Sequence, residues 1–173
     1  MKKLFILALS LFSFSSIKAQ KSHVILISID GLRPEFYKDS SWGMVNLRQA
    51  MQNGVYADGV NGVFPTVTYP SHTTMVTGVK PLKHGIYYNT PSEPLQITGK
   101  WNWNYEQIKV PTIFSLAKEK GLKTASIFWP VSVGSPADYN VPEYWYLPTA
   151  KGGKRDMVRA LSENAFPKGF YEE

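Results

Sequence analysis

The chain has 173 residues, with 19 Lys and Arg against 13 Asp and Glu, and it has no cysteine. The formal charge of +6 falls to +3 when the first nineteen residues are set aside, because they hold three lysines and no acid. This composition excludes a disulfide framework and thiolate metal sites, and no stable nucleic-acid complex is expected from so small a charge.

The N-terminus is predicted to be a targeting segment. Residues 1–19 begin with two lysines, continue with an apolar run from Leu4 to Phe14, and end in a short polar stretch before the final Ala19. That order is typical of a secretory signal peptide, and the run is well short of the roughly 20 residues that span a bilayer. We therefore expect an exported protein, periplasmic or secreted, with no transmembrane helix beyond the signal peptide. Residues 20–173 are enough for one domain.

The first predicted element of that domain is a strand. His23–Ile29 is a nearly continuous apolar run that stops at Asp30-Gly31, which is typical of a strand buried on both faces of a parallel sheet. Asp30 would then lie at the carboxyl end of the strand, where ligands collect in open α/β sheets, and its carboxylate can bind a divalent metal. Asp-Gly is also a common turn signal, so both interpretations stay open. Apolar spacing over 44–51 predicts a helix that ends at Gly54.

The stretch FPTVTYPSH, residues 64–72, leads into a short helix expected over 71–77, with Gly78 at its end. Thr68 precedes this helix. Its hydroxyl can cap the helix, or it can react where the helix dipole favours negative charge. A threonine hydroxyl needs an adjacent base or a metal ion for such chemistry. Ser71 and His72 are not expected to form a catalytic pair, because adjacent residues on a helix diverge.

Three polar residues near this helix have structural alternatives. His72 is expected to be a packed, hydrogen-bonded histidine, and His84, which precedes a glycine turn, is open to the same interpretation. Asn89 lies on a loop, where its amide can donate to a phosphoryl oxygen or can form a turn. The aromatic loop Trp101–Tyr105 can line a substrate face, although such loops more often pack onto the domain.

The second half of the chain adds a helix and a strand. Thr112 is a plausible N-cap for a helix that ends at Gly121, and 124–129 is predicted to be a buried strand ended by Pro130. The order of strands and helices predicts an α/β fold with a mostly parallel sheet flanked by helices. Two strands do not complete a sheet of the usual size, so the fold is expected to be incomplete in this chain. From Tyr146 onward we expect loops, with a few helical residues over 157–161.

Three motifs occur in order along the chain: ILISIDGLRP, then GVFPTVTYPSHTTMVTGVKPLKHGIYYN, then PTIFSLAKEKGLKTASIFWP. They closely resemble successive segments of the nucleotide pyrophosphatase/phosphodiesterase family, of the alkaline phosphatase superfamily, from about His23 to about Trp145. The resemblance implies that residues 20–173 are the N-terminal portion of an alkaline-phosphatase-like domain. It also implies metal-dependent hydrolysis of phosphodiester or pyrophosphate bonds in small, nucleotide-like substrates.

The same resemblance implies roles for particular residues. Asp30 matches a metal-ligand aspartate, Thr68 matches the nucleophile that also contacts the metals, and Asn89 matches an asparagine that binds the phosphoryl group. The implied cofactor is a pair of divalent metal ions, zinc by preference. Thr66 matches a position with no catalytic assignment. Ser71 stands where the family commonly has Asn, a departure close to the site.

The implied zinc sites also need further Asp and His ligands, and no histidine follows His84. Because the chain holds about half of such a site, it is expected to be inactive without the rest. We therefore expect a fragment, and two alternatives stay open: half of a split enzyme completed by another polypeptide, or a non-catalytic module that binds phosphate or nucleotide. Hydrolysis of phosphomonoesters, phosphonates or sulfate esters stays open as well, because the sequence does not show which residues line the substrate pocket.

Overall fold

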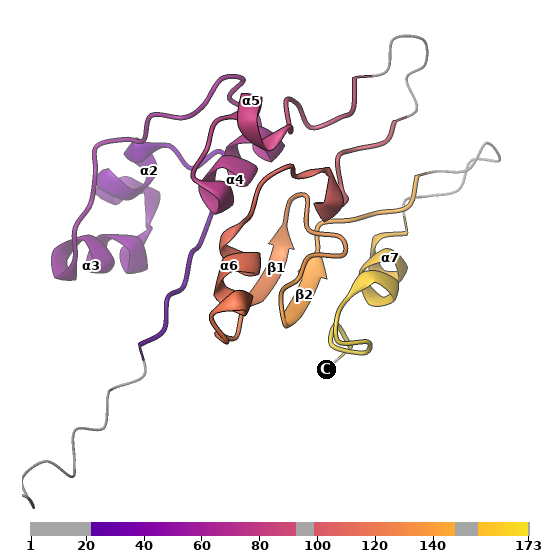
Figure 1. Ribbon diagram of the computed structural model, residues 1–173. Coiled ribbons are helices and arrows are strands. Elements are labelled where there is room, and N and C mark those ends of the chain that lie inside the picture. Colours follow the sequence, from indigo (N-terminus) through magenta and orange to yellow (C-terminus); the bar gives the residue numbers. More distant parts are fainter. Residues whose placement is uncertain (1–21, 93–98, 148–155, 173) are drawn as a thin grey trace, which may run out of the picture. The chain divides into compact units, whose positions relative to one another are not determined.

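The computed structural model describes residues 22–92, 99–147 and 156–172 (Figure 1). The predicted signal peptide, 1–19, lies outside the described residues. The chain divides into two compact units, Met1–Leu32 and Arg33–Glu173, and each is described by itself. No helix in the described part of the chain is both long enough and apolar enough to cross a membrane.

The described part of the first unit, 22–32, has neither helix nor strand. The prediction of a buried strand over His23–Ile29 is therefore wrong, and Val24, Ile25 and Ile27 are largely exposed. A strand needs backbone partners on a neighbouring strand, and no described strand pairs with this run. Asp30-Gly31 does form a turn, in which Gly31 has a positive φ and the Leu32 N–H donates to the Ile29 carbonyl oxygen at 3.4 Å.

The second unit begins with three short helices: α2 (Pro34–Lys38), the 3-10 helix η1 (Ser40–Trp42) and α3 (Val45–Asn53). α3 confirms the helix predicted from apolar spacing, and Gly54 follows its last residue. Gly54 has an extended backbone, however, so this helix does not end in a left-handed glycine. None of the three helices contains a buried residue.

The rest of the second unit carries the sheet and its helices. In chain order these are α4 (Thr68–Thr77), α5 (Pro81–His84), the 3-10 helix η2 (Tyr105–Gln107), α6 (Ile113–Glu119), β1 (Ala125–Trp129), β2 (Tyr139–Pro142) and α7 (Met157–Asn164). β1 and β2 pair in parallel, with Ala125 opposite Tyr139, and α7 packs beside β2 (Figure 1). The α/β class and its parallel pairing are confirmed.

Individual elements in this part agree with the sequence to different degrees. Thr112 is the N-cap of α6, where its hydroxyl accepts from the Ser115 N–H, and Gly121 follows with a positive φ. β1 confirms the predicted strand, but Ile127 and Phe128 are half exposed, so β1 is not buried on both faces. β2 was not predicted, because Tyr139–Pro142 has too few apolar residues to form a pattern.

The buried side chains of the second unit form three clusters, which follow the chain from α4 to α7. One joins the start of α4 to the aromatic loop, and its members are Tyr69, Ile86, Trp103, Val131 and Trp145. A second joins the end of α4 to α6 and β1 through Val76, Phe114, Trp129 and Ala137. The third joins β2 to α7 through Val141, Leu161 and Ala165. α4 is thus held at both ends, which fixes the position of its first residues.

Candidate functional site

Thr68 is the first residue of α4 and is half-buried. The helix predicted over 71–77 therefore begins earlier than expected. Proline is tolerated in a first turn, so Pro70 does not delay the helix. The N-cap is Val67, which has an extended backbone and an aliphatic side chain that cannot accept a hydrogen bond. Thr68 consequently does not hold the capping position. Its hydroxyl lies at the positive end of a ten-residue helix.

Asn89 is joined to this helix start by a hydrogen bond. Its Oδ1 accepts from the Tyr69 N–H at 2.9 Å, so the structure brings Asn89 to the residue that directly follows Thr68. A backbone N–H can only donate, and the amide must therefore turn its oxygen to Tyr69. The NH₂ end of the same amide is then the end that can donate to an incoming oxygen.

The backbone donors of the first turn are largely committed. The Tyr69 N–H is used by Asn89, Pro70 has no N–H, and the Ser71 N–H donates to the Val67 carbonyl oxygen. A helix start usually offers several such donors to an anion. At this helix start, the Asn89 amide is placed to supply side-chain donors where the backbone ones are used.

Both histidines near the site have structural roles. The His72 Nδ1 lies 2.8 Å from the Thr68 carbonyl oxygen and so carries the proton, and its ring packs edge-on against Trp129. The His84 Nδ1 accepts from the Ile86 N–H, which leaves Nε2 to donate to the Thr74 hydroxyl at 3.0 Å. Burial lowers the pKa of His84 below its ordinary value. The expectation for His72 is confirmed, and His84 follows the structural alternative.

The residue next to the nucleophile candidate is fully buried. The Tyr69 ring packs edge-on against Trp101, with 5.3 Å between ring centroids, and belongs to the same cluster as Trp103 and Trp145. Burial, and then the negative charge of Glu143, raise the pKa of the Tyr69 hydroxyl far above its ordinary value. The aromatic loop therefore packs onto the domain under Tyr69, as the more common of its two interpretations predicts.

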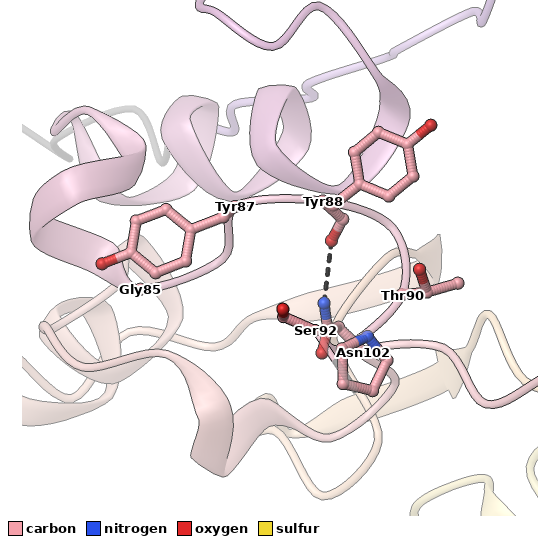
Figure 2. Close-up of a pocket in the computed structure, with 7 residues that line it drawn as sticks. Gly85, Tyr87, Tyr88, Thr90, Ser92 and Asn102 are labelled. Carbon is pink, nitrogen blue, oxygen red and sulfur yellow. Dashed lines mark hydrogen bonds between the residues drawn. The ribbon is translucent and has the colours of Figure 1, made fainter. Parts of the chain in front are cut away.

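A cavity of about 430 Å³ lies along the loop that contains Asn89 (Figure 2). Both sequence neighbours of Asn89 line it, and the rings of Tyr87 and Tyr88 project to opposite sides of the loop. The lining is rich in hydroxyl and amide groups, and its members are Gly85, Tyr87, Tyr88, Thr90, Pro91, Ser92 and Asn102. Such a lining suits a small polar molecule.

Asp30 lies in the first unit, where it is exposed at the turn. No group of three or more His, Cys, Asp or Glu side chains that could hold a metal ion occurs among the described residues. A closed zinc site takes four ligands, so Asp30 and Thr68 can be only part of one. The residues matched to the site therefore fall into two sets. Thr68 and Asn89 belong to the second unit, where Asn89 is bonded to the residue after Thr68, and Asp30 belongs to the first unit.

Sequence reasoning missed Asn102, which is buried between the tryptophans of the aromatic loop. A polar residue flanked by two large aromatic residues was the available signal, because a buried amide requires hydrogen-bond partners. Those partners turn out to be the backbone of Tyr88 and Asn89 and the side chain of Gln107.

Several curated phosphodiesterases are similar in sequence to this chain. The ectonucleotide pyrophosphatase/phosphodiesterase family member 1 of Homo sapiens is 33% identical over 123 residues, which cover 67% of this chain and 13% of the relative. The family member 3 of Bos taurus is 32% identical over 63% of the chain. The venom phosphodiesterase of Naja atra is 32% identical over 65% of the chain and 14% of the relative. The chain thus spans only about an eighth of the length of these curated relatives.

The type I phosphodiesterase / nucleotide pyrophosphatase family matches residues 24–167, which is most of the chain and extends beyond the three sequence motifs. The match includes Asp30, Thr68 and Asn89. The α/β fold with parallel strand pairing agrees with an alkaline-phosphatase-like domain. The chain belongs to the type I phosphodiesterase / nucleotide pyrophosphatase family.

Proposed function

We propose that this chain supplies the nucleophile-bearing part of a metal-dependent phosphodiesterase or nucleotide pyrophosphatase site. The observation that carries the proposal is the hydrogen bond from the Tyr69 N–H to the Asn89 side chain, which holds the Asn89 amide at the residue after Thr68. The family match and the names of the relatives support the reaction class. The substrate class is a small phosphate ester, and the cavity along the loop that contains Asn89 gives room for part of one.

Thr68 is the proposed nucleophile. Its Oγ gives up the hydroxyl proton and bonds to phosphorus, the bond from phosphorus to one ester oxygen breaks, and the departing oxygen takes up a proton. Water then cleaves the phosphoryl-threonine and restores the hydroxyl. The Asn89 NH₂ donates to a phosphoryl oxygen as negative charge develops there, and the α4 dipole adds to this stabilisation.

A divalent metal pair, zinc by preference, is the proposed cofactor. When bound, such ions lower the pKa of a hydroxyl and stabilise the leaving oxygen. The oxygen donors that this chain would contribute are the Asp30 carboxylate and the Thr68 hydroxyl, both of which suit a divalent ion. Since the described residues offer no cluster of three ligands, we expect purified chain with added zinc to show no turnover. The remaining ligands would come from further residues of a longer chain, or from a complementing polypeptide.

We propose further that the protein is exported, through the signal peptide at 1–19, to the periplasm or the medium. Residues 20–173 would form the N-terminal portion of the phosphodiesterase domain. Fusion of the first 25 residues to a reporter that is active only outside the cytoplasm tests export, and a reporter that stays inactive would contradict it.

The test of the reaction uses a chimera. In the venom phosphodiesterase of Naja atra, the segment that aligns with this chain is replaced by the corresponding segment of this chain. The chimera is expected to hydrolyse bis-p-nitrophenyl phosphate, and Thr68→Ala is expected to abolish turnover. Asn89→Ala is expected to lower kcat by about 10² to 10³-fold, as for the loss of one donor to a developing oxyanion.

Thr66→Ala is the matched control, because Thr66 is an exposed threonine close to Thr68 whose hydroxyl donates to the Val63 carbonyl oxygen. It should keep the parental rate. Turnover that survives Thr68→Ala would contradict the proposal. Faster hydrolysis of p-nitrophenyl phosphate, a phosphonate ester or p-nitrophenyl sulfate than of the diester would assign a different activity within the superfamily. Metal-independent binding of orthovanadate by the purified chain would favour a non-catalytic binding module.

A further inference from the structure

The aromatic loop contains a polar residue that reaches the candidate site through hydrogen bonds. We infer that Asn102 is a positioning residue, which fixes the backbone of Asn89 so that its side chain is held at the start of α4. The inference rests on the proposed role of Asn89 in phosphoryl binding. It assigns a task to the Trp101–Tyr105 loop, which the proposed function does not otherwise use.

Asn102 binds two successive carbonyl groups of the Asn89 loop. Its side-chain Nδ2 donates to the Tyr88 carbonyl oxygen at 2.8 Å (Figure 2), and its backbone N–H donates to the Asn89 carbonyl oxygen at 2.8 Å. These carbonyls belong to the peptide groups immediately before and after the Asn89 Cα. With both peptide planes held, the direction of the Cα–Cβ bond of Asn89 is set.

The orientation of the Asn102 amide is itself fixed. Its Oδ1 accepts from the Gln107 Nε2 at 2.9 Å, and the Gln107 Oε1 accepts from the Asn104 N–H at 3.0 Å. The Asn102 Nδ2 must therefore face Tyr88. A chain of amides thus runs from η2 through Asn102 to Asn89, and from there to Tyr69, the neighbour of Thr68.

The burial of Asn102 makes this contact specific for an amide. The residue is only 6% exposed, and the neighbouring Trp103 is buried in the cluster that contains Tyr69. An aspartate of the same shape would place a carboxylate oxygen against the Tyr88 carbonyl oxygen, where two acceptors repel each other. It would also bury a charge without a cation. Asn102→Asp therefore removes the contact while leaving the volume unchanged.

The Tyr69 amide reports directly on the position of Asn89. It is the second amide of α4, and the first four N–H groups of a helix have no acceptor within the helix. Protection of the Tyr69 N–H from hydrogen exchange thus depends on the Asn89 Oδ1. Activity is not needed for this readout.

The experiment is residue-resolved amide hydrogen exchange by NMR on the full chain. Wild type is expected to protect the Tyr69 N–H, and Asn89→Ala to remove this protection. Asn102→Asp is expected to lower the protection of the Tyr69 N–H by about tenfold or more, because a buried hydrogen bond is lost. The amides of α6 and β1 should stay protected. The side-chain NH₂ signals of Asn89 should shift in the same variant. Asn104→Asp is the matched control, since the Asn104 side chain is exposed and the substitution keeps the backbone N–H that donates to Gln107, and it should leave Tyr69 protected.

An unprotected Tyr69 N–H in wild type, or unchanged protection in Asn102→Asp, would overturn the inference. If Asn102→Asp loses protection throughout the chain, that variant has unfolded, and Gln107→Leu is measured in its place. Gln107→Leu releases the Asn102 amide without adding a charge. A selective fall at Tyr69 in that variant supports the inference, and an unchanged Tyr69 overturns it. The two proposals can fail separately. If Asn102→Asp loses Tyr69 protection while the chimera with Asn89→Ala keeps full turnover, this inference stands and the phosphoryl-binding role of Asn89 is rejected.

Discussion

Helices α3 and α4 have nearly the same length but differ in what surrounds them. None of the nine residues of α3 is buried, whereas five of the ten residues of α4 are buried: Tyr69, Pro70, His72, Thr73 and Val76. Apolar spacing or a terminal glycine predicted both helices. The difference shows that a local pattern determines where a helix forms, while its packing partners determine whether it can hold a reactive group in place.

The partners of α4 come from distant parts of the second unit. Trp101 and Trp103 pack at its start, Trp129 from β1 packs against His72, and Phe114 from α6 lies in the cluster with Val76. In α3, Val45 is 63% exposed, and no described residue buries it. Four predictions test this contrast, and each of the first three pairs a substitution at a buried residue with one at an exposed residue.

The largest effect is expected at the cluster under Tyr69. Trp103→Ala should lower the free energy of unfolding by about 3 to 5 kcal/mol, because it removes a large buried side chain and leaves a cavity in the cluster. Trp42→Ala should cost less than about 1 kcal/mol, because Trp42 is 56% exposed and its ring packs against that of Phe36 without being buried. Urea unfolding followed by far-UV circular dichroism measures both. Equal losses in the two variants would show that the aromatic loop is not a core.

A pair of identical substitutions compares the two helices directly. Val76→Ala in α4 should destabilise by about 2 kcal/mol through the loss of two buried methyl groups. Val45→Ala in α3 should change stability by about 0.5 kcal/mol or less, since alanine has the better helix propensity and no packing is lost. The same urea titration applies. A larger loss in Val45→Ala than in Val76→Ala would reverse the contrast.

A smaller effect is expected at the cap of α6. Thr112→Ala should cost about 1 kcal/mol, because the hydroxyl accepts from the Ser115 N–H and also contacts the Tyr105 hydroxyl at 2.8 Å. Thr66→Ala, at an exposed threonine, should cost about 0.5 kcal/mol or less. Thermal unfolding compares the two variants. If Thr112→Ala has no effect, α6 does not depend on its cap.

The smallest effect is a pH dependence from His84. Burial lowers its pKa below the ordinary 6.5, so the unfolded chain binds a proton more readily than the folded one. The stability that neutral His84 contributes is fully present above the ordinary pKa of 6.5. It is lost as the pH falls from 6.5 toward the lowered pKa of the folded state, with a slope of at most about 1.4 kcal/mol per pH unit. Unfolding midpoints between about pH 7.5 and about pH 5.5 measure this slope. His84→Gln should flatten it, and an unchanged slope would assign it to another group.

The sequence predicted the elements whose signals are local. Thr112 with Gly121, the apolar spacing of α3 and the apolar residues of β1 before Pro130 each correspond to an observed helix or strand. His23–Ile29 has an equally strong strand signal but forms no strand, because no described strand pairs with it. Thr68 and Asn89 were predicted through motif resemblance, yet the hydrogen bond from the Tyr69 N–H to the Asn89 side chain was not, because it depends on a loop closing onto a helix start. Asn102 was missed for the same reason, since its partners are distant in sequence.

The most direct measurement is rapid-quench mass spectrometry of the chimera during turnover of bis-p-nitrophenyl phosphate. The account predicts that a p-nitrophenylphosphoryl group is transiently attached to Thr68, and that Asn89→Ala slows its formation. A chimera that turns over the diester with Thr68 unmodified at every time point, or with the group on another residue, would contradict the account.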